Sequence, residues 1–204
     1  MIDIVSVLAD LGGLITSPRQ TFRIIFAEKR GLLPAVVVFL VMVTVQSLVT
    51  VSNFIARFLG LTGSFLGGFG GSLSAFIGLL GVAGMIIVGT IFWLILGLLI
   101  HAFARVLGGK ADIEKALIVL GYAKVSFFIY VILAFVAIFT SFLVSLGLLI
   151  VGYLISAVLW VIVASTGVSE TYGISMGRGL ASVILPFIVL ATIPFLMFIP
   201  FMFW

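Results

Sequence analysis

Residues 32–56 read LLPAVVVFLVMVTVQSLVTVSNFIA and contain no charged side chain. A run of this length matches the roughly 20 apolar residues that a helix needs to cross the ~30 Å hydrocarbon core of a bilayer. Four more runs of similar character follow it, at 72–104, 125–142, 146–164 and 180–204. The sequence therefore predicts an all-α membrane protein with about five transmembrane helices.

The overall composition points the same way. Of the 204 residues, 64% are hydrophobic and 8% are charged, and the mean hydropathy is +1.53, far from the values of soluble domains. The absence of cysteine excludes disulfides and thiolate sites. The net charge of +4 is spread over the ends of several spans, whereas a nucleic-acid-binding module would gather it in one stripe. We expect one membrane domain over 32–204, with anionic headgroups and no nucleic acid beside it.

The charges also predict an orientation. Nearly all of them fall in three short clusters, at 3–30, 105–124 and 170–178. With five spans and the N-terminus inside, Arg57 alone among the Lys and Arg residues lies outside, as the positive-inside rule favours. We therefore expect a cytoplasmic N-terminus and an external C-terminus in a cell membrane.

Two short amphipathic helices are expected in the cytoplasmic segment 1–31, before the first span. The apolar face of the first lies opposite Asp3 and Asp10. In the second, Ser17 and Pro18 form a cap and first-turn pair. The apolar face of this second helix consists of Phe22, Ile25 and Phe26. Such a face rests either in the lipid headgroup layer or against the protein's own helices, and the pattern leaves both open.

Glycine and proline mark the remaining boundaries. Segment 58–72 holds six glycines, which are unfavourable in a helix, so we expect an outer loop there. The alternative is a helix-packing seam of small residues at Gly63, Gly67, Gly71 and Ala75. Run 72–104 is longer than one span needs, and whether it forms one helix or two stays open. The prolines at 186, 194 and 200 predict a kinked or irregular last span.

Between the second and third spans, Gly108 and Gly109 predict a helix end, and Asp112 is placed to cap a helix from Ile113. A span that began at Ala116 would put Lys124 two turns inside the membrane. We therefore expect a short interfacial helix over 113–123, a third span from about 125, and no charge near the centre of any span.

Residues 101–124 read HAFARVLGGKADIEKALIVLGYAK. This segment resembles the central signature of the Yip family, the Ypt- or Rab-interacting membrane proteins, in which a span ends in a histidine, L-G-G follows, and an amphipathic segment ends in G-Y-A. The matching positions are His101, Leu107, Gly108, Gly109, Gly121, Tyr122 and Ala123. Two weaker likenesses lie at Pro18, Thr21 and Phe22, similar to the family's P-x-x-T-F, and at 173–180, similar to the opening of its fifth span.

The resemblance implies a five-span domain without known catalytic chemistry. Eukaryotic members act in vesicle traffic by contacting prenylated small GTPases and each other. Only about thirty residues precede the first span here, which indicates a prokaryotic relative in which a GTPase partner is not assumed. The family usually has a proline just after G-Y-A, where this chain has Val125 and Ser126.

Our first functional hypothesis is a non-enzymatic membrane protein with a membrane-organising or trafficking-like role. It binds a protein or lipid partner through its basic cytoplasmic face, as a homo-oligomer. The candidate residues on that face are Arg19, Arg23, Arg105, Lys110, Asp112, Lys115, Glu170 and Arg178.

The second hypothesis is a channel or transporter for a small neutral solute. Its evidence is a set of polar residues within the spans, which serve equally as ordinary contacts between helices. They are Thr44, Gln46, Ser47, Thr90, Tyr130, Tyr153 and Ser156.

The third hypothesis is a Ser-His hydrolase. Residues 173–177 match G-x-S-x-G, and His101 is the chain's only histidine. Ser175 also fits the N-cap of the last span, the interpretation we favour, and His101 fits a helix C-terminus, where it interacts with the helix dipole. One histidine among scattered acids lacks the spacing of a metal site, so we expect no metal or cofactor.

Overall fold

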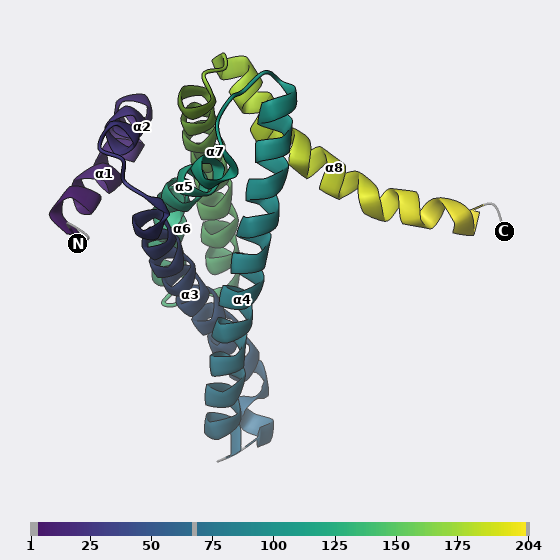
Figure 1. The fold of residues 1–204 in the computed structure, drawn as a ribbon. Helices are drawn as coiled ribbons and strands as arrows, with labels where there is room; N and C mark the ends of the chain where they lie inside the picture. The colour runs from purple at the N-terminus through teal and green to yellow at the C-terminus, as the bar shows by residue number, and fades with distance from the viewer. Residues whose placement is uncertain (1–3, 67–68, 203–204) are drawn as a thin grey trace. The chain divides into compact units, whose positions relative to one another are not determined.

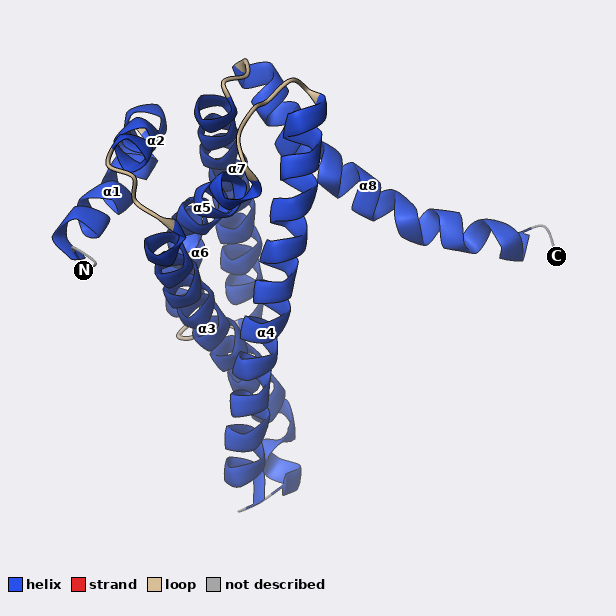
Figure 2. Ribbon diagram, in the orientation of Figure 1, coloured by secondary structure: helices blue, strands red, loops and turns tan. Residues whose placement is uncertain are grey.

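The computed structural model describes the backbone of residues 4–66 and 69–202 and the side chains of 6–57 and 74–192, and every regular element in these ranges is a helix (Figure 2). This confirms the predicted all-α fold. In chain order (Figure 1), the elements are α1 (Ile4–Thr16), α2 (Pro18–Ala27), α3 (Leu32–Leu66), α4 (Phe69–Val106), α5 (Ile113–Ala123), the 3₁₀ helix η1 (Lys124–Phe127), α6 (Phe128–Ala137), α7 (Phe142–Tyr172) and α8 (Met176–Met202).

Four stretches of described residues are long and apolar enough to cross a membrane. They are Leu32–Arg57, Ser74–Val106, Ile113–Ala137 and Phe142–Tyr172, and α8 adds a shorter apolar stretch, Met176–Thr192. Large apolar side chains point outward from these helices, among them Leu79, Val88 and Leu143 at 72%, 65% and 78% exposure. Such surfaces suit contact with lipid, and the chain is an integral membrane protein.

The glycine-rich segment is helical where its backbone is described. α3 continues to Leu66 over 35 residues and α4 begins at Phe69, so the loop expected over 58–72 is wrong outside Gly67 and Gly68, which lie beyond the described residues. In a bilayer a helix satisfies its own backbone hydrogen bonds, and this outweighs the entropic cost of glycine. α4 is one helix of 38 residues, which answers the question left open for 72–104.

The chain divides into two compact units. Unit 1 consists of Met1–Ala35, Trp93–Ala123 and Val161–Trp204, and unit 2 consists of Val36–Phe92 and Lys124–Trp160. Helices α1, α2, α5 and α8 belong to unit 1, whereas η1 and α6 belong to unit 2. The long helices α3, α4 and α7 are divided, with one part of each in unit 1 and the rest in unit 2.

In unit 1, α2 packs against the protein itself. Its start is the predicted one, with Pro18 in the first turn and Ser17 O accepting a hydrogen bond from Thr21 N at 3.1 Å. Phe22 and Ile25 are fully buried. The ring of Phe22 lies so close to Gly167 on α7 that a Cβ there would be 2.7 Å from its Cε2 atom. Of the two positions left open for this face, the structure favours contact with the protein's own helices over the lipid headgroup layer for Phe22 and Ile25.

The region around Lys124 combines one confirmed prediction with one correction. α5 covers Ile113–Ala123, as predicted, and Lys115 N donates to Asp112 O at 3.1 Å. η1 then interrupts the helix, and α6 ends at Ala137, short of the expected span end at 142. Since α5 is itself apolar, Lys124 falls near the middle of the span candidate Ile113–Ala137, and the expectation that no span holds a central charge fails here. The Lys124 Nζ atom lies 4.2 Å from the centre of the Phe127 ring, a cation–π contact.

Candidate functional site

Tyr172, at the end of α7, holds the loop between α4 and α5. Its side chain is 3% exposed, and its hydroxyl oxygen lies 2.8 Å from Nδ1 of His101. The hydroxyl donates to Asp112 O at 3.3 Å, and the carbonyl oxygen of Tyr172 accepts a bond from Lys110 N, also at 3.3 Å. One buried tyrosine therefore connects α4, the loop and α7.

These bonds assign roles to His101 and Ser175. The 2.8 Å hydrogen bond between Nδ1 of His101 and the Tyr172 hydroxyl gives the histidine a partner on α7. Ser175 directly precedes α8, and its carbonyl oxygen accepts a bond from Gly179 N at 2.9 Å, which confirms the predicted N-cap position. The partner that the structure gives the His101 ring is Tyr172, and Ser175 lies at the start of α8, where a serine is a favoured cap.

The glycines of L-G-G shape the end of α4. Gly108 has a φ of +99°, a conformation that favours glycine. Gly109 N donates to Ala104 O at 2.8 Å and closes the helix, as predicted. A Cβ at Gly109 would lie 2.7 Å from Cδ1 of Tyr172, so a larger residue would push the tyrosine away. The two glycines therefore end the helix and bring the loop onto Tyr172.

The G-Y-A positions form a second close contact. A Cβ at Gly121 would lie 2.6 Å from the carbonyl oxygen of Ala35, so the backbone of α5 touches the first turn of α3. Tyr122 and Ala123 are fully buried. The motif positions of α5 therefore act by packing.

A buried ion pair joins α1 to the segment before α3. Asp10 is 5% exposed and pairs with Arg30, whose Nε also donates to Glu28 Oε2 at 2.8 Å. Burial raises the pKa of the Asp10 carboxyl above its ordinary value, although the charge of Arg30 acts in the opposite direction. Asp10 is therefore buried, although it lies opposite the apolar face that the sequence predicts for α1. Its partner is twenty residues away, and periodicity within α1 carries no information about that pairing.

Three of the candidate charged residues form a bridge between α2 and α7. Arg19 and Arg23 both bind Glu170, and Arg23 Nε lies 2.8 Å from its Oε2 atom. The two arginine side chains are 68% and 62% exposed, whereas that of Glu170 is 12% exposed. Ion pairs with partners this exposed contribute only about 0–1 kcal/mol.

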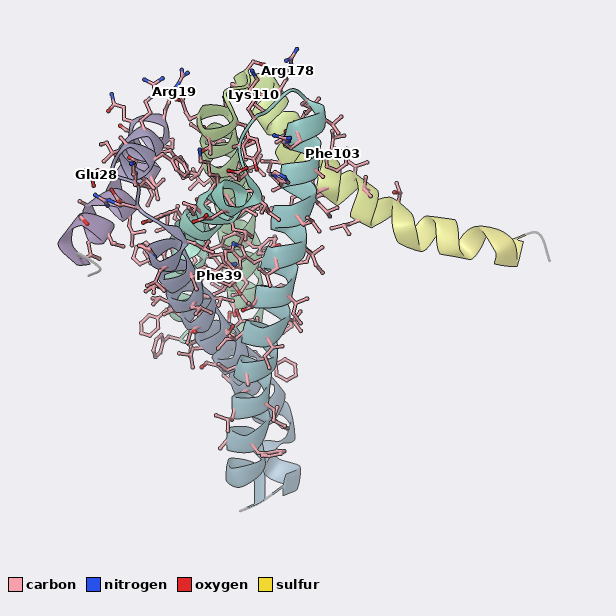
Figure 3. The ribbon with its side chains drawn as sticks, viewed as in Figure 1. Arg19, Glu28, Phe39, Phe103, Lys110 and Arg178 are labelled. Atoms are coloured by element: carbon pink, nitrogen blue, oxygen red, sulfur yellow. The ribbon has the colours of Figure 1, made fainter. Side chains whose placement is uncertain are left out.

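The other five candidates form what we call the loop surface: Arg105, Lys110, Asp112, Lys115 and Arg178, all exposed. Arg178 Nη1 donates to Leu107 O at 3.3 Å and so caps the end of α4. Figure 3 shows Arg19, Lys110 and Arg178 at the same end of the view. All eight candidates lie in unit 1.

Sequence reasoning missed Tyr172, Asp10 and Arg30 as organising residues of this site. A tyrosine directly before Gly173, at a helix end, gives a local signal of termination. Nothing local connects it to His101, which lies 71 residues earlier.

A family model of the Yip1 domain matches residues 12–199. The match includes every position at which the sequence resembles the Yip family, from Pro18 to Leu180, and it confirms that resemblance. No curated protein and no solved structure matches the chain.

Proposed function

The chain belongs to the Yip1 domain family, and from this premise we propose that it is a non-enzymatic integral membrane protein that binds an acidic partner through its loop surface. The partner is an acidic protein segment or the anionic headgroups of lipids. On the positive-inside rule, this surface faces the cytoplasm. The exposed apolar sides of α4 and α7 suit lipid or a second copy of the chain.

The contrast between a fixed backbone and exposed charges carries this proposal. Backbone atoms of Leu107, Lys110 and Asp112 are hydrogen-bonded to Arg178 and Tyr172. The side chains of Lys110 and Asp112 nevertheless remain exposed. The backbone that carries these charges is already ordered before a partner binds. This lowers the conformational-entropy cost of binding. Four cations with one carboxylate favour a partner of negative charge.

The test is charge reversal at Lys110 and Lys115, whose side chains make none of the hydrogen bonds described above. Binding of a short-chain anionic lipid, dioctanoyl-phosphatidylglycerol, and of its zwitterionic phosphatidylcholine analogue is measured on the purified protein. Membrane extracts are also searched for proteins captured by the wild type. We expect the double variant K110E/K115E to weaken the anionic interaction at least about tenfold, since each cation near a charged surface contributes about 1 kcal/mol.

Lys29→Glu is the matched control, because Lys29 is exposed in unit 1 but lies outside the loop surface. It should bind as the wild type does. The proposal is wrong if the double variant retains both lipid binding and protein capture.

A second candidate function rests on unit 2, which buries polar side chains of α3, α6 and α7, including Ser47, Asn53 and Ser156. They favour a channel or transporter for a small neutral solute. Purified protein in liposomes should then raise the flux of such solutes above that of empty vesicles, and equal flux would reject this function.

A further inference from the structure

In unit 2, α3 and α6 run side by side and parallel, joined by a ladder of side-chain hydrogen bonds. The bonds are Thr50 Oγ1 to Tyr130 Oη (3.0 Å), Asn53 Nδ2 to Ala134 O (2.8 Å), Arg57 Nη2 to Ala137 O (2.7 Å) and Arg57 Nη1 to Thr140 O (2.9 Å). The partners are 80, 81, 80 and 83 residues apart, so the two segments keep a nearly constant register.

One turn before this ladder, the same offset of 80 residues pairs Gln46 of α3 with Ser126, which lies in η1 directly before α6. The position on α3 is fixed, because Thr50 Oγ1 donates back to Gln46 O at 2.7 Å. The side-chain atoms Gln46 Oε1 and Ser126 Oγ are both buried and have no hydrogen-bond partner among the described residues. Ser126 is only 2% exposed. An unpaired buried polar atom costs about 1–3 kcal/mol, so two of them on facing segments call for a bridging group.

The surroundings restrict what that group can be. Val49, Phe127 and Trp160 belong to the apolar cluster around Tyr130. The only charged residues in the sequence of unit 2 are Arg57 and Lys124, both positive, so a cation would be repelled. Gln46 Oε1 is a hydrogen-bond acceptor and disfavours an anion. A neutral donor is the chemistry that remains.

We propose that Gln46 and Ser126 form a binding site inside the apolar part of the protein for a small neutral molecule with an N–H or O–H group, such as a primary amide or an alcohol. The ligand donates a hydrogen bond to Gln46 Oε1, and the hydroxyl of Ser126 pairs with the ligand's own acceptor. The site is separate from the loop surface of unit 1. It requires binding but no transport, so it is tested independently of flux.

Trp160 provides the readout, because it packs against the cluster that contains Phe127 and Tyr130. With Trp93 and Trp204 replaced by Phe, it is the only tryptophan in the 204-residue sequence. The protein is reconstituted in phosphatidylcholine vesicles and titrated with acetamide or with N,N-dimethylacetamide, which keeps the carbonyl but lacks the N–H group. We expect a saturable change in Trp160 emission with acetamide, and at least about tenfold weaker binding of the dimethyl compound, because Gln46 Oε1 then receives no hydrogen bond.

Ser126→Ala and Gln46→Leu should each lower the affinity for acetamide about fivefold or more, the value of one hydrogen bond. Thr44→Val is the control, since Thr44 lies on the opposite side of α3 from Gln46, and it should leave the affinity unchanged. Ser126→Ala removes a single oxygen atom and decides the result where Gln46→Leu fails to fold. The proposal is overturned by a Trp160 signal that does not saturate, by equal affinity for the two probes, or by an acetamide affinity in Ser126→Ala equal to that of the wild type.

Discussion

Unit 1 and unit 2 are held together by different kinds of contact. Unit 1 relies on close backbone approaches, such as Gly121 against Ala35, and on ion pairs, such as Asp10 with Arg30. Unit 2 contains no acidic residue, and its described polar contacts include the ladder between α3 and α6 and a bond from Tyr130 N of α6 to Ser156 Oγ of α7. All the positions at which the sequence resembles the Yip family lie in unit 1. The comparison teaches that these family positions mark packing geometry, and that they say little about unit 2.

The largest effect is expected in unit 2, from the loss of Arg57. Arg57→Leu removes the charged donors to Ala137 O and Thr140 O at the end of α6. Hydrogen bonds to charged groups are worth about 1.5–3 kcal/mol each, so we expect the free energy of unfolding to fall by about 3 kcal/mol. Denaturant unfolding in detergent micelles, followed by tryptophan fluorescence, measures it. Arg57→Lys keeps the charge and should recover part of the loss; a loss under about 0.5 kcal/mol for Arg57→Leu would show that the ladder does not hold unit 2 together.

In unit 1, Gly121→Ala should come next. The new methyl group would meet the Ala35 carbonyl oxygen at 2.6 Å, and a backbone atom cannot turn aside as a side chain can. Overpacking of this kind costs about 1–3 kcal/mol, and we expect about 2 kcal/mol in the same unfolding assay.

Gly177→Ala is the matched control, because a Cβ at Gly177 has no heavy atom within 4 Å. It lies in α8, where alanine is favoured over glycine by about 0.5–1 kcal/mol. If the two alanine variants are equally stable, close backbone contact is not what unit 1 depends on.

The smallest effect is expected from Tyr172→Phe, which removes only the hydroxyl bonded to His101 and Asp112. One such hydrogen bond contributes about 1 kcal/mol. A double-mutant cycle with His101→Ala should give less than the sum of the two single losses, because both changes delete the same bond. Strict additivity would mean that His101 and Tyr172 act separately in the folded protein.

The features predicted correctly from the sequence are helix boundaries that depend on the chemistry of neighbouring residues. Pro18 after Ser17, Ile113 after Asp112 and the double glycine after Leu107 each place a helix boundary by local chemistry, and the helices begin or end there. The end of α5 before Lys124, predicted from the cost of burying an amine, is confirmed by the change to η1, although the apolar stretch extends to both sides of this residue.

The features not predicted are pairings between distant residues. Asp10 with Arg30, His101 with Tyr172, and Arg57 with the end of α6 join positions 20 to 83 residues apart. Helical periodicity shows which face of a helix is buried but not which residue lies against it. The clustering of the candidate charges in the sequence predicts that they lie together at helix ends. Their hydrogen-bond partners, such as Leu107 O for Arg178, are known only from the structure.

The lengths of α3 and α4 have a consequence for the membrane itself. At about 1.5 Å per residue, their 35 and 38 residues extend about 52 Å and 57 Å, against a hydrocarbon core of about 30 Å. Helices so much longer than the local bilayer tilt or draw thicker lipid around them. Because the glycine-rich segment remains helical on both sides of 67–68, we expect the protein to respond to the thickness of its bilayer, a dependence that needs no partner at all.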